Sequence, residues 1–229
     1  TEVPFMRTKC CNIFSFLYDR EGNFWFGSCY EGVEFHPARN SFTCYATRKN
    51  DSSDRGKVVS AVCELKDGQY LLGNENDGIL LFDRHAGTVV PYRTAQNVGT
   101  AIYNVFSMLV DDQTLWIAAF QRGIEAVDLK SRTVKSYLAD PSDPSSRVFV
   151  LFRSSSGRIW AGTSVGLFYY DRFEDRFVTR DPKVRISDIT EDHAGRLWIA
   201  TNEDGLYSYD ARTDLLQHYR YDPDDPATI

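Results

Sequence analysis

The chain has 229 residues, of which 42% are hydrophobic and 14% aromatic, so it has enough apolar material for a substantial core and is not disordered. Its 26 basic and 32 acidic residues leave a formal net charge of −6, which argues against nucleic acid or an anionic membrane as a partner. No apolar stretch approaches the roughly 20 residues that cross a bilayer, and no signal-peptide layout is present. We therefore expect no membrane contact from this segment, and any anchor of a longer parent protein would lie outside it.

Cysteine usage is confined to the first part of the chain and is odd in number: Cys10, Cys11, Cys29, Cys44 and Cys63. An odd number does not fit a disulfide framework. Two adjacent cysteines without a nearby histidine pair do not match zinc-ligand spacing. We expect free or buried thiols, no metal and no cofactor.

From the N-terminus onward, one pattern occurs five times. A turn runs into an apolar strand at 22–27, 68–73, 113–118, 157–162 and 195–200. Six or seven residues past the Trp or Leu of that strand a second glycine opens another apolar or aromatic run, at Gly32, Gly78, Gly123, Gly166 and Gly205. An apolar segment precedes each turn, and a short final strand ends near an aromatic residue. Each repeat therefore holds four strands, over residues 12–46, 58–93, 104–138, 147–179 and 185–220.

The repeat length selects the fold. Spacings of 46, 45, 44 and 38 residues separate Trp25, Leu71, Trp116, Trp160 and Trp198. Four short strands in about 40 to 50 residues are typical of a β-propeller blade. Strands of stacked blades are covered on both faces, which fits apolar runs such as Phe24-Trp25-Phe26. The sequence predicts an all-β protein, a β-propeller with about five four-stranded blades and almost no α-helix.

Two recurring residue types have structural interpretations. The tryptophans stand at one repeat position and are expected to pack between blades. An aspartate follows the second glycine by five residues in four repeats, at Asp83, Asp128, Asp171 and Asp210, where its carboxylate can accept backbone N–H groups of the next turn.

Repeat five, Asp192 to Asp210, reads Asp-x-x-Gly-x-Leu-Trp-Ile-Ala-Thr, then Gly-Leu and Tyr-x-Tyr-Asp, and resembles the two-component regulator propeller repeat. Repeats one and four match well, whereas repeats two and three depart at Leu71, Gln113 and Ala118. The resemblance implies the periplasmic sensor domain of a bacterial hybrid two-component system, a sensor histidine kinase and response regulator in one chain that responds to glycan breakdown products. No kinase or receiver signature lies in this chain.

Two similar linkers suggest a fragment of a larger propeller array, and the resemblance implies that its ring has seven blades. Asp140-Pro141-Ser142-Asp143-Pro144 follows repeat three and Asp222-Pro223-Asp224-Asp225-Pro226 follows repeat five, where a sixth repeat would begin. Terminal blades without neighbours would expose apolar faces, so we expect self-association or closure of the five blades. We interpret the linkers as rigid extended connectors rather than calcium sites.

A propeller binds ligands on the loops between its second and third strands and on the connections between blades. Aromatic side chains there can stack on a sugar ring, and polar ones can hydrogen-bond around it. These criteria select Tyr30, Glu31, Asn76, Asp77, Tyr103, Phe120, Gln121, Arg122, Arg147, Glu203 and Asp204. The alternative interpretation of each residue is an ordinary solvated loop position.

Two other functions remain open. The first is a protein-interaction scaffold, which the sequence does not separate from an oligosaccharide sensor. The second is a lyase, because a propeller enzyme that opens streptogramin antibiotics has similar repeats and uses a histidine. His193 belongs to a turn at the opposite end, and His36, His85 and His218 lie near outer turns, so no catalytic grouping can be assembled. The sequence favours a non-catalytic segment.

Overall fold

A computed structural model describes residues 13–28, 32–36, 58–75, 78–92, 104–221 and 224, together with the backbone of 43–45. The described residues form twenty strands and one short 3-10 turn, η1 (Pro144–Ser146). They divide into two compact units, residues 1–105 and 106–229. The all-β prediction with almost no helix is confirmed.

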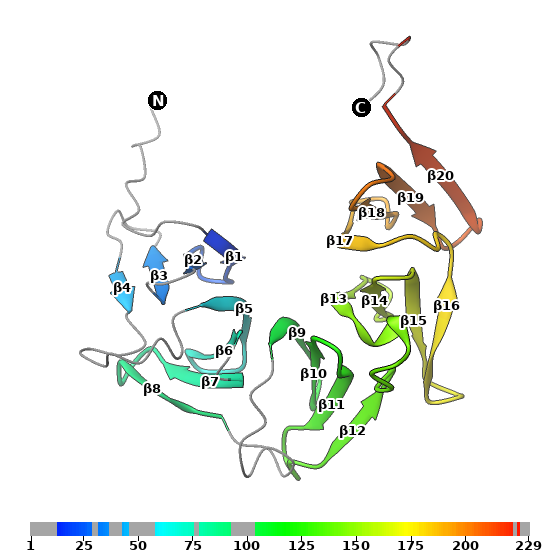
Figure 1. Ribbon diagram of the computed structural model, residues 1–229. Helices are drawn as coiled ribbons and strands as arrows, with labels where there is room; N and C mark the ends of the chain where they lie inside the picture. Colours follow the sequence, from blue (N-terminus) through cyan, green and yellow to red (C-terminus); the bar gives the residue numbers. More distant parts are fainter. Residues whose placement is uncertain are drawn as a thin grey trace. The chain divides into compact units, whose positions relative to one another are not determined.

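The first unit contains two antiparallel four-stranded blades. Blade 1 consists of β1 (Ile13–Tyr18), β2 (Phe24–Ser28), β3 (Val33–His36) and β4 (Thr43–Tyr45). Blade 2 consists of β5 (Val59–Glu64), β6 (Gln69–Asn74), β7 (Gly78–Asp83) and β8 (Thr88–Pro91). In both blades the strands are hydrogen-bonded in chain order (Figure 1).

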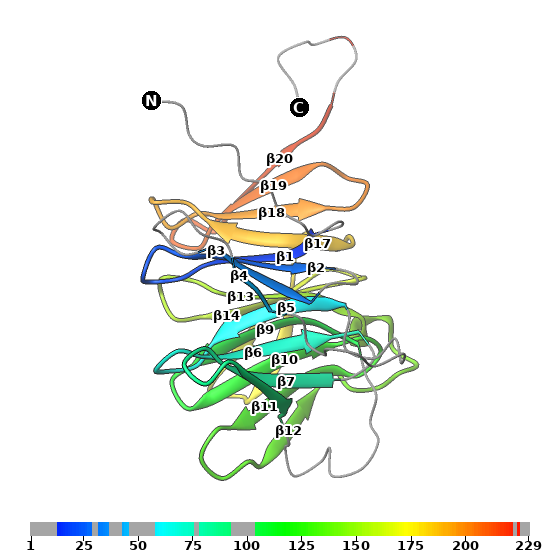
Figure 2. The same ribbon diagram turned by 90° about the vertical axis from the view of Figure 1, so that its left-hand side faces the viewer.

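The second unit contains three blades of the same kind. Val105, the first residue of β9, is the last residue of the first unit. Blade 3 consists of β9 (Val105–Asp111), β10 (Thr114–Ala119), β11 (Gly123–Asp128) and β12 (Val134–Tyr137). Blade 4 consists of β13 (Val148–Arg153), β14 (Ile159–Thr163), β15 (Leu167–Asp171) and β16 (Arg176–Arg180). Blade 5 consists of β17 (Ile186–Glu191), β18 (Leu197–Thr201), β19 (Leu206–Asp210) and β20 (Leu215–Tyr219), which lie side by side in chain order (Figures 1 and 2). The β-propeller prediction of five four-stranded blades is confirmed.

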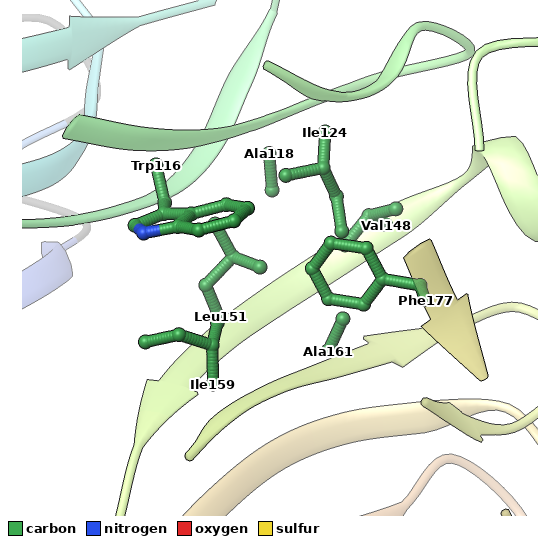
Figure 3. Packing of buried hydrophobic residues seen from close by; sticks show 8 residues of the cluster. All are labelled: Trp116, Ala118, Ile124, Val148, Leu151, Ile159, Ala161 and Phe177. Atoms are coloured by element: carbon green, nitrogen blue, oxygen red, sulfur yellow. The ribbon is translucent and has the colours of Figure 1, made fainter. Parts of the chain in front are cut away.

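Three tryptophans fill the spaces between successive blades. In the first unit Trp25 is fully buried and its ring lies 4.1 Å from that of Tyr70 in blade 2. In the second unit Trp116 of blade 3 packs with Leu151 and Phe177 of blade 4 (Figure 3). Trp160 of blade 4 packs in the same way against blade 5. The predicted packing role holds at these three positions.

Trp198 differs from the other three. It is half-buried, and its ring stacks on Tyr219 of its own blade at 5.6 Å. Its Nε1 donates to Asp192 at 3.1 Å, a bond that Trp25 also makes, with Asp19 at 2.8 Å. The described contacts of Trp198 therefore lie within its blade rather than between blades.

The four repeated aspartates cap turns as predicted. Asp83 Oδ1 accepts the backbone N–H groups of His85 and Ala86, both at 2.9 Å. Asp128, Asp171 and Asp210 repeat the arrangement in their blades. These hydrogen bonds favour the ionised form and lower the pKa of Asp128 and Asp83 below the usual range. Their role is structural.

The linker after blade 3 is turned, so the prediction of an extended connector is wrong. Asp140 Oδ1 accepts from the Ser142 backbone N–H at 2.9 Å, and Asp143 Oδ1 accepts from Ser145 N–H at 2.8 Å, which starts η1. Each carboxylate satisfies a donor that an extended chain would leave to solvent. In the part of the chain that is described, no cluster of metal-ligating side chains occurs here or elsewhere.

Cys63 is a free, buried thiol, and burial raises its pKa to about 12, so it is unreactive near neutral pH. The side chains of the other cysteines lie outside the described residues. Among the described residues, no helix has the length and apolar character needed to span a bilayer.

Blade 1 buries a histidine, from which a pH dependence follows. His36 is 2% exposed, with Nε2 3.3 Å from Glu34 Oε1, and burial lowers its pKa to about 4. The unfolded chain binds a proton below about pH 6.5, whereas the folded chain binds it only near pH 4, so stability falls as the pH falls through that window. We expect urea unfolding of the chain to show this loss between pH 6.5 and 4.

The matched variant is His36→Gln, which cannot take up the proton. At pH 7.5 the free energy of unfolding of the variant should be equal to or lower than that of the unsubstituted chain. Between pH 6.5 and 4, however, the variant should lose less of this free energy than the unsubstituted chain does. Parallel pH profiles for the two proteins would show that another group titrates.

Candidate ligand-binding site

In blades 4 and 5 the loop between the second and third strands contacts the residue that precedes the first strand. Ser164 N–H, in the β14–β15 loop, donates to the Arg147 carbonyl at 3.0 Å, just before β13. Asn202 N–H, in the β18–β19 loop, donates to the Arg185 carbonyl at 3.1 Å, just before β17. We call this the loop end of a blade. In these two blades the within-blade loop and the between-blade connection therefore lie together.

A bulge lies at the loop end of the first strands. In β13 the pairing with β14 shifts between Val148 and Val150, and in β17 the pairing with β18 shifts between Ile186 and Asp188. Blades 1 and 2 repeat the shift at the same position. A bulge redirects the side chain of the extra residue and is often found near functional sites. In blade 4 that residue is Phe149.

Phenylalanine side chains form a row across blades 3 and 4. The ring of Phe120, in the β10–β11 loop, lies 5.8 Å from Phe106 at 76°. Phe106 in turn lies 5.6 Å from Phe149 at 56°. We call Phe120, Phe106 and Phe149 the aromatic row. All three remain partly accessible, and Phe120 is 38% exposed, so the row offers apolar surface at the loop end.

The β10–β11 turn holds three of the predicted site residues. Gln121 adopts a left-handed φ of 57° at the exposed tip, and Arg122 N–H donates to the Ala119 carbonyl at 3.2 Å. The Arg122 side chain lies 3.7 Å from the buried Glu125 carboxylate. That contact restrains Arg122 while its side chain stays 43% exposed.

Arg147 and Arg185 occupy the same position in blades 4 and 5, one residue before the first strand. Arg185 lies over the Phe149 ring, with its Cζ 4.6 Å from the ring centroid, and so extends the aromatic row with a cation. The Arg147 backbone is fixed twice, by its N–H to the Pro144 carbonyl and by its own carbonyl to Ser164. Both side chains are exposed.

The predicted residues of blade 5 have structural partners. Asp204 accepts from Tyr207 Oη at 2.5 Å and pairs with Arg220 at 3.2 Å. The hydrogen bond from Tyr207 lowers the pKa of Asp204, and burial together with that bond raises the pKa of Tyr207 to about 12. Glu203 accepts from the Asn202 side chain at 3.3 Å and is exposed. Asp204 is therefore already engaged, whereas Glu203 faces solvent.

Five predicted site residues lie outside the described residues: Tyr30, Glu31, Asn76, Asp77 and Tyr103. The structure adds Phe106, Phe149 and Arg185, which sequence reasoning missed. One signal was available, because Phe14, Phe106 and Phe149 stand at one repeat position and Arg185 aligns with Arg147. Ligand binding by any of these residues remains a prediction.

The opposite end of blades 3 and 4 is hollowed but internally paired. A cavity of about 560 Å³ is lined by Arg153, Arg158 and Arg172, among others. The buried Asp111 carboxylate accepts from Arg153 Nε at 2.7 Å and from Arg172 at 2.8 Å. Two of the three arginines are thus held by Asp111, which makes this cavity a weaker candidate than the aromatic row.

The histidines do not form a catalytic group among the described residues. His218 lies in β20, and its ring is stacked on Tyr207 at 3.9 Å and 4°. Its Nε2 is 2.6 Å from the Asp204 carbonyl oxygen, so the nitrogen is used in a backbone contact. His193 lies in the β17–β18 turn at the end opposite the loops.

Comparison with known families identifies the repeat. The family model described as "Two component regulator propeller" matches residues 181–203, which include β17 and β18 of blade 5. Blade 5 therefore carries a two-component regulator propeller repeat. The tryptophan, glycine and aspartate positions of this segment recur in the other blades.

Three proteins similar to this chain differ in how much of it they match. Histidine kinase P4 from Formosa agariphila is 34% identical over 97 residues, covering 35% of this chain and 7% of that protein. The extracellular domain of a hybrid two-component system from B. thetaiotaomicron has a TM-score of 0.79 at 18% identity, covering 96% of this chain and 30% of that one. Virginiamycin B lyase from Staphylococcus aureus has a TM-score of 0.73 at 14% identity, covering 95% and 72%. The two solved structures establish the shared propeller fold alone, and the chain spans a small part of both the kinase and the sensor.

Proposed function

We propose that the chain is a ligand-sensing propeller segment of a hybrid two-component sensor histidine kinase, located in the periplasm and itself non-catalytic. The proposal is supported by the propeller repeat and by the likeness to the histidine kinase from Formosa agariphila and to an extracellular sensor domain. Kinase activity would belong to other parts of the parent protein.

The ligand class that fits the loop end is an oligosaccharide derived from glycan breakdown. The observation behind this proposal is the aromatic row, with Phe120 edge-on to Phe106 and Phe149 beside it. Flat apolar rings bordered by polar loop residues such as Gln121 and Glu203 suit the faces and hydroxyl groups of sugars.

A thermal-shift screen of the 229-residue chain against an oligosaccharide panel tests the proposal. A ligand at about 100 times its dissociation constant adds roughly 2.7 kcal/mol of stability, which raises the melting temperature by several degrees. Phe120→Ala should cost less than about 1 kcal/mol in stability, because the ring is partly exposed, yet should weaken the shift.

Phe173→Ala is the matched control. Phe173 is fully exposed in the β15–β16 turn, away from the loop end, so its removal should leave sugar binding unchanged. The alternative, a protein-interaction scaffold, is supported by this same exposed ring. If no sugar shifts the melting temperature and Phe173→Ala abolishes capture of a protein partner, the scaffold function replaces the sensor.

A further inference from the structure

We propose that the ligand of the loop end is an acidic saccharide, whose carboxylate or sulfate group is bound by Arg147 and Arg185 while a sugar ring stacks on the aromatic row. This inference rests on the proposed sensing function and specifies its ligand. It follows from a comparison of which arginines in the second unit are paired with a carboxylate and which are not.

Most arginines of the second unit hold an acidic partner. Six of them contact an aspartate within 4 Å: Arg153, Arg172, Arg180, Arg196, Arg212 and Arg220. Within residues 104–221, by contrast, neither Arg147 nor Arg185 is paired with a carboxylate. In a chain of net charge −6 with abundant aspartate, two guanidinium groups without a carboxylate partner among these residues are available at the loop end for an anionic ligand.

The placement of these two arginines adds to the argument. Arg147 lies two residues before Phe149 in the sequence, and Arg185 covers the Phe149 ring from blade 5 at 4.6 Å. A guanidinium group over an aromatic face keeps its N–H donors at the ring edge, where they can form paired hydrogen bonds to a planar carboxylate or to sulfate oxygens. Because Arg185 occupies this face of Phe149, a sugar ring would stack on the neighbouring Phe106 or Phe120, with its acidic substituent directed toward Arg185.

The backbone supports of both residues restrict their positions. The Arg185 carbonyl accepts from Asn202, and the Arg147 backbone is held by η1 and Ser164. Binding therefore orders two side chains and little main chain, which lowers the entropic cost of association. A short oligosaccharide fits better than a long polyanion, because the chain as a whole carries a net charge of −6 and would repel the rest of a polyanion.

The test is calorimetric titration of the 229-residue chain with matched pairs of sugars. The pairs are tri-galacturonate with its methyl ester, and sulfated with unsulfated chondroitin disaccharide. We expect an acidic member to bind at least tenfold more tightly than its neutral counterpart. Its affinity should fall as the NaCl concentration is raised from 50 to 300 mM. Arg147→Gln and Arg185→Gln should each weaken binding about tenfold, and Arg185→Lys should recover only part of the loss because the planar fork is missing.

Arg158→Gln is the matched control. Arg158 also stacks on aromatic rings, with Cζ 5.0 Å from the Tyr169 centroid, but it lies at the opposite end of blade 4. Its replacement should leave the affinity for the acidic sugars unchanged.

Two results would overturn this inference and leave the sensor proposal standing. One is equal binding of the neutral and acidic members of each pair, and the other is unchanged affinity in both arginine variants. Inorganic sulfate binding as tightly as the sugars overturns the saccharide part, and an absence of any sugar binding overturns both proposals.

Discussion

Replacement of Trp160 with alanine is expected to destabilise the second unit by about 3–5 kcal/mol. The side chain is 2% exposed and lies among Leu167, Leu197 and Tyr209, so its removal opens a cavity between blades 4 and 5. Two hydrogen-bonded sheets cannot close this cavity without breaking their own ladders. Urea denaturation followed by circular dichroism measures the loss.

Trp198→Ala is the comparison variant at the same repeat position. Trp198 is half-buried and contacts Tyr219 and Asp192 of its own blade, so its loss should cost clearly less, about 1–2 kcal/mol. An equal loss of unfolding free energy in the two variants would mean that Trp198 makes further packing contacts beyond those described. A Trp160 variant that keeps its stability but loses ligand binding would assign this ring to the site.

The architecture could be predicted from sequence because it repeats. Turn glycines, the tryptophan and the capping aspartate recur at nearly fixed spacing, so each blade supported the interpretation of the others. The segments predicted at 22–27, 68–73, 113–118, 157–162 and 195–200 each contain the start of a second strand, β2, β6, β10, β14 or β18. These features depend on local turn chemistry and on apolar runs, both of which are legible in the residues themselves.

The site was predictable only in part, because its geometry depends on features without a residue signature. Phe106 and Phe149 stand in the apolar segments that precede the turns, so the sequence marked them only as strand residues, whereas a bulge at Phe149 lies at the loop end. Asp204 was selected as a free polar group, but Arg220 and Tyr207 occupy it through pairing within blade 5. The turned linker arises in the same way, from the carboxylates of Asp140 and Asp143 capping their own backbone.

The second large effect is expected at Gly123, the first residue of β11. Its φ is 71°, which costs an alanine about 1–2 kcal/mol, and an added Cβ would lie 2.2 Å from the Tyr137 carbonyl oxygen and 2.3 Å from that of Leu138. These atoms belong to the backbone and cannot rotate away, so blade 3 must shift to admit a methyl group. We expect Gly123→Ala to cost about 3 kcal/mol or more, adding overpacking to backbone strain.

Gly78→Ala separates the two causes. Gly78 begins β7 at the equivalent position of blade 2 with a φ of 72°, but an added Cβ meets no heavy atom within 4 Å among the described residues. Its replacement should therefore cost only the conformational part, about 1–2 kcal/mol. Chemical denaturation of both variants measures the difference. Equal losses would show that the carbonyl groups of Tyr137 and Leu138 move aside freely, and that the glycine after the second strand is required for its dihedral angle alone.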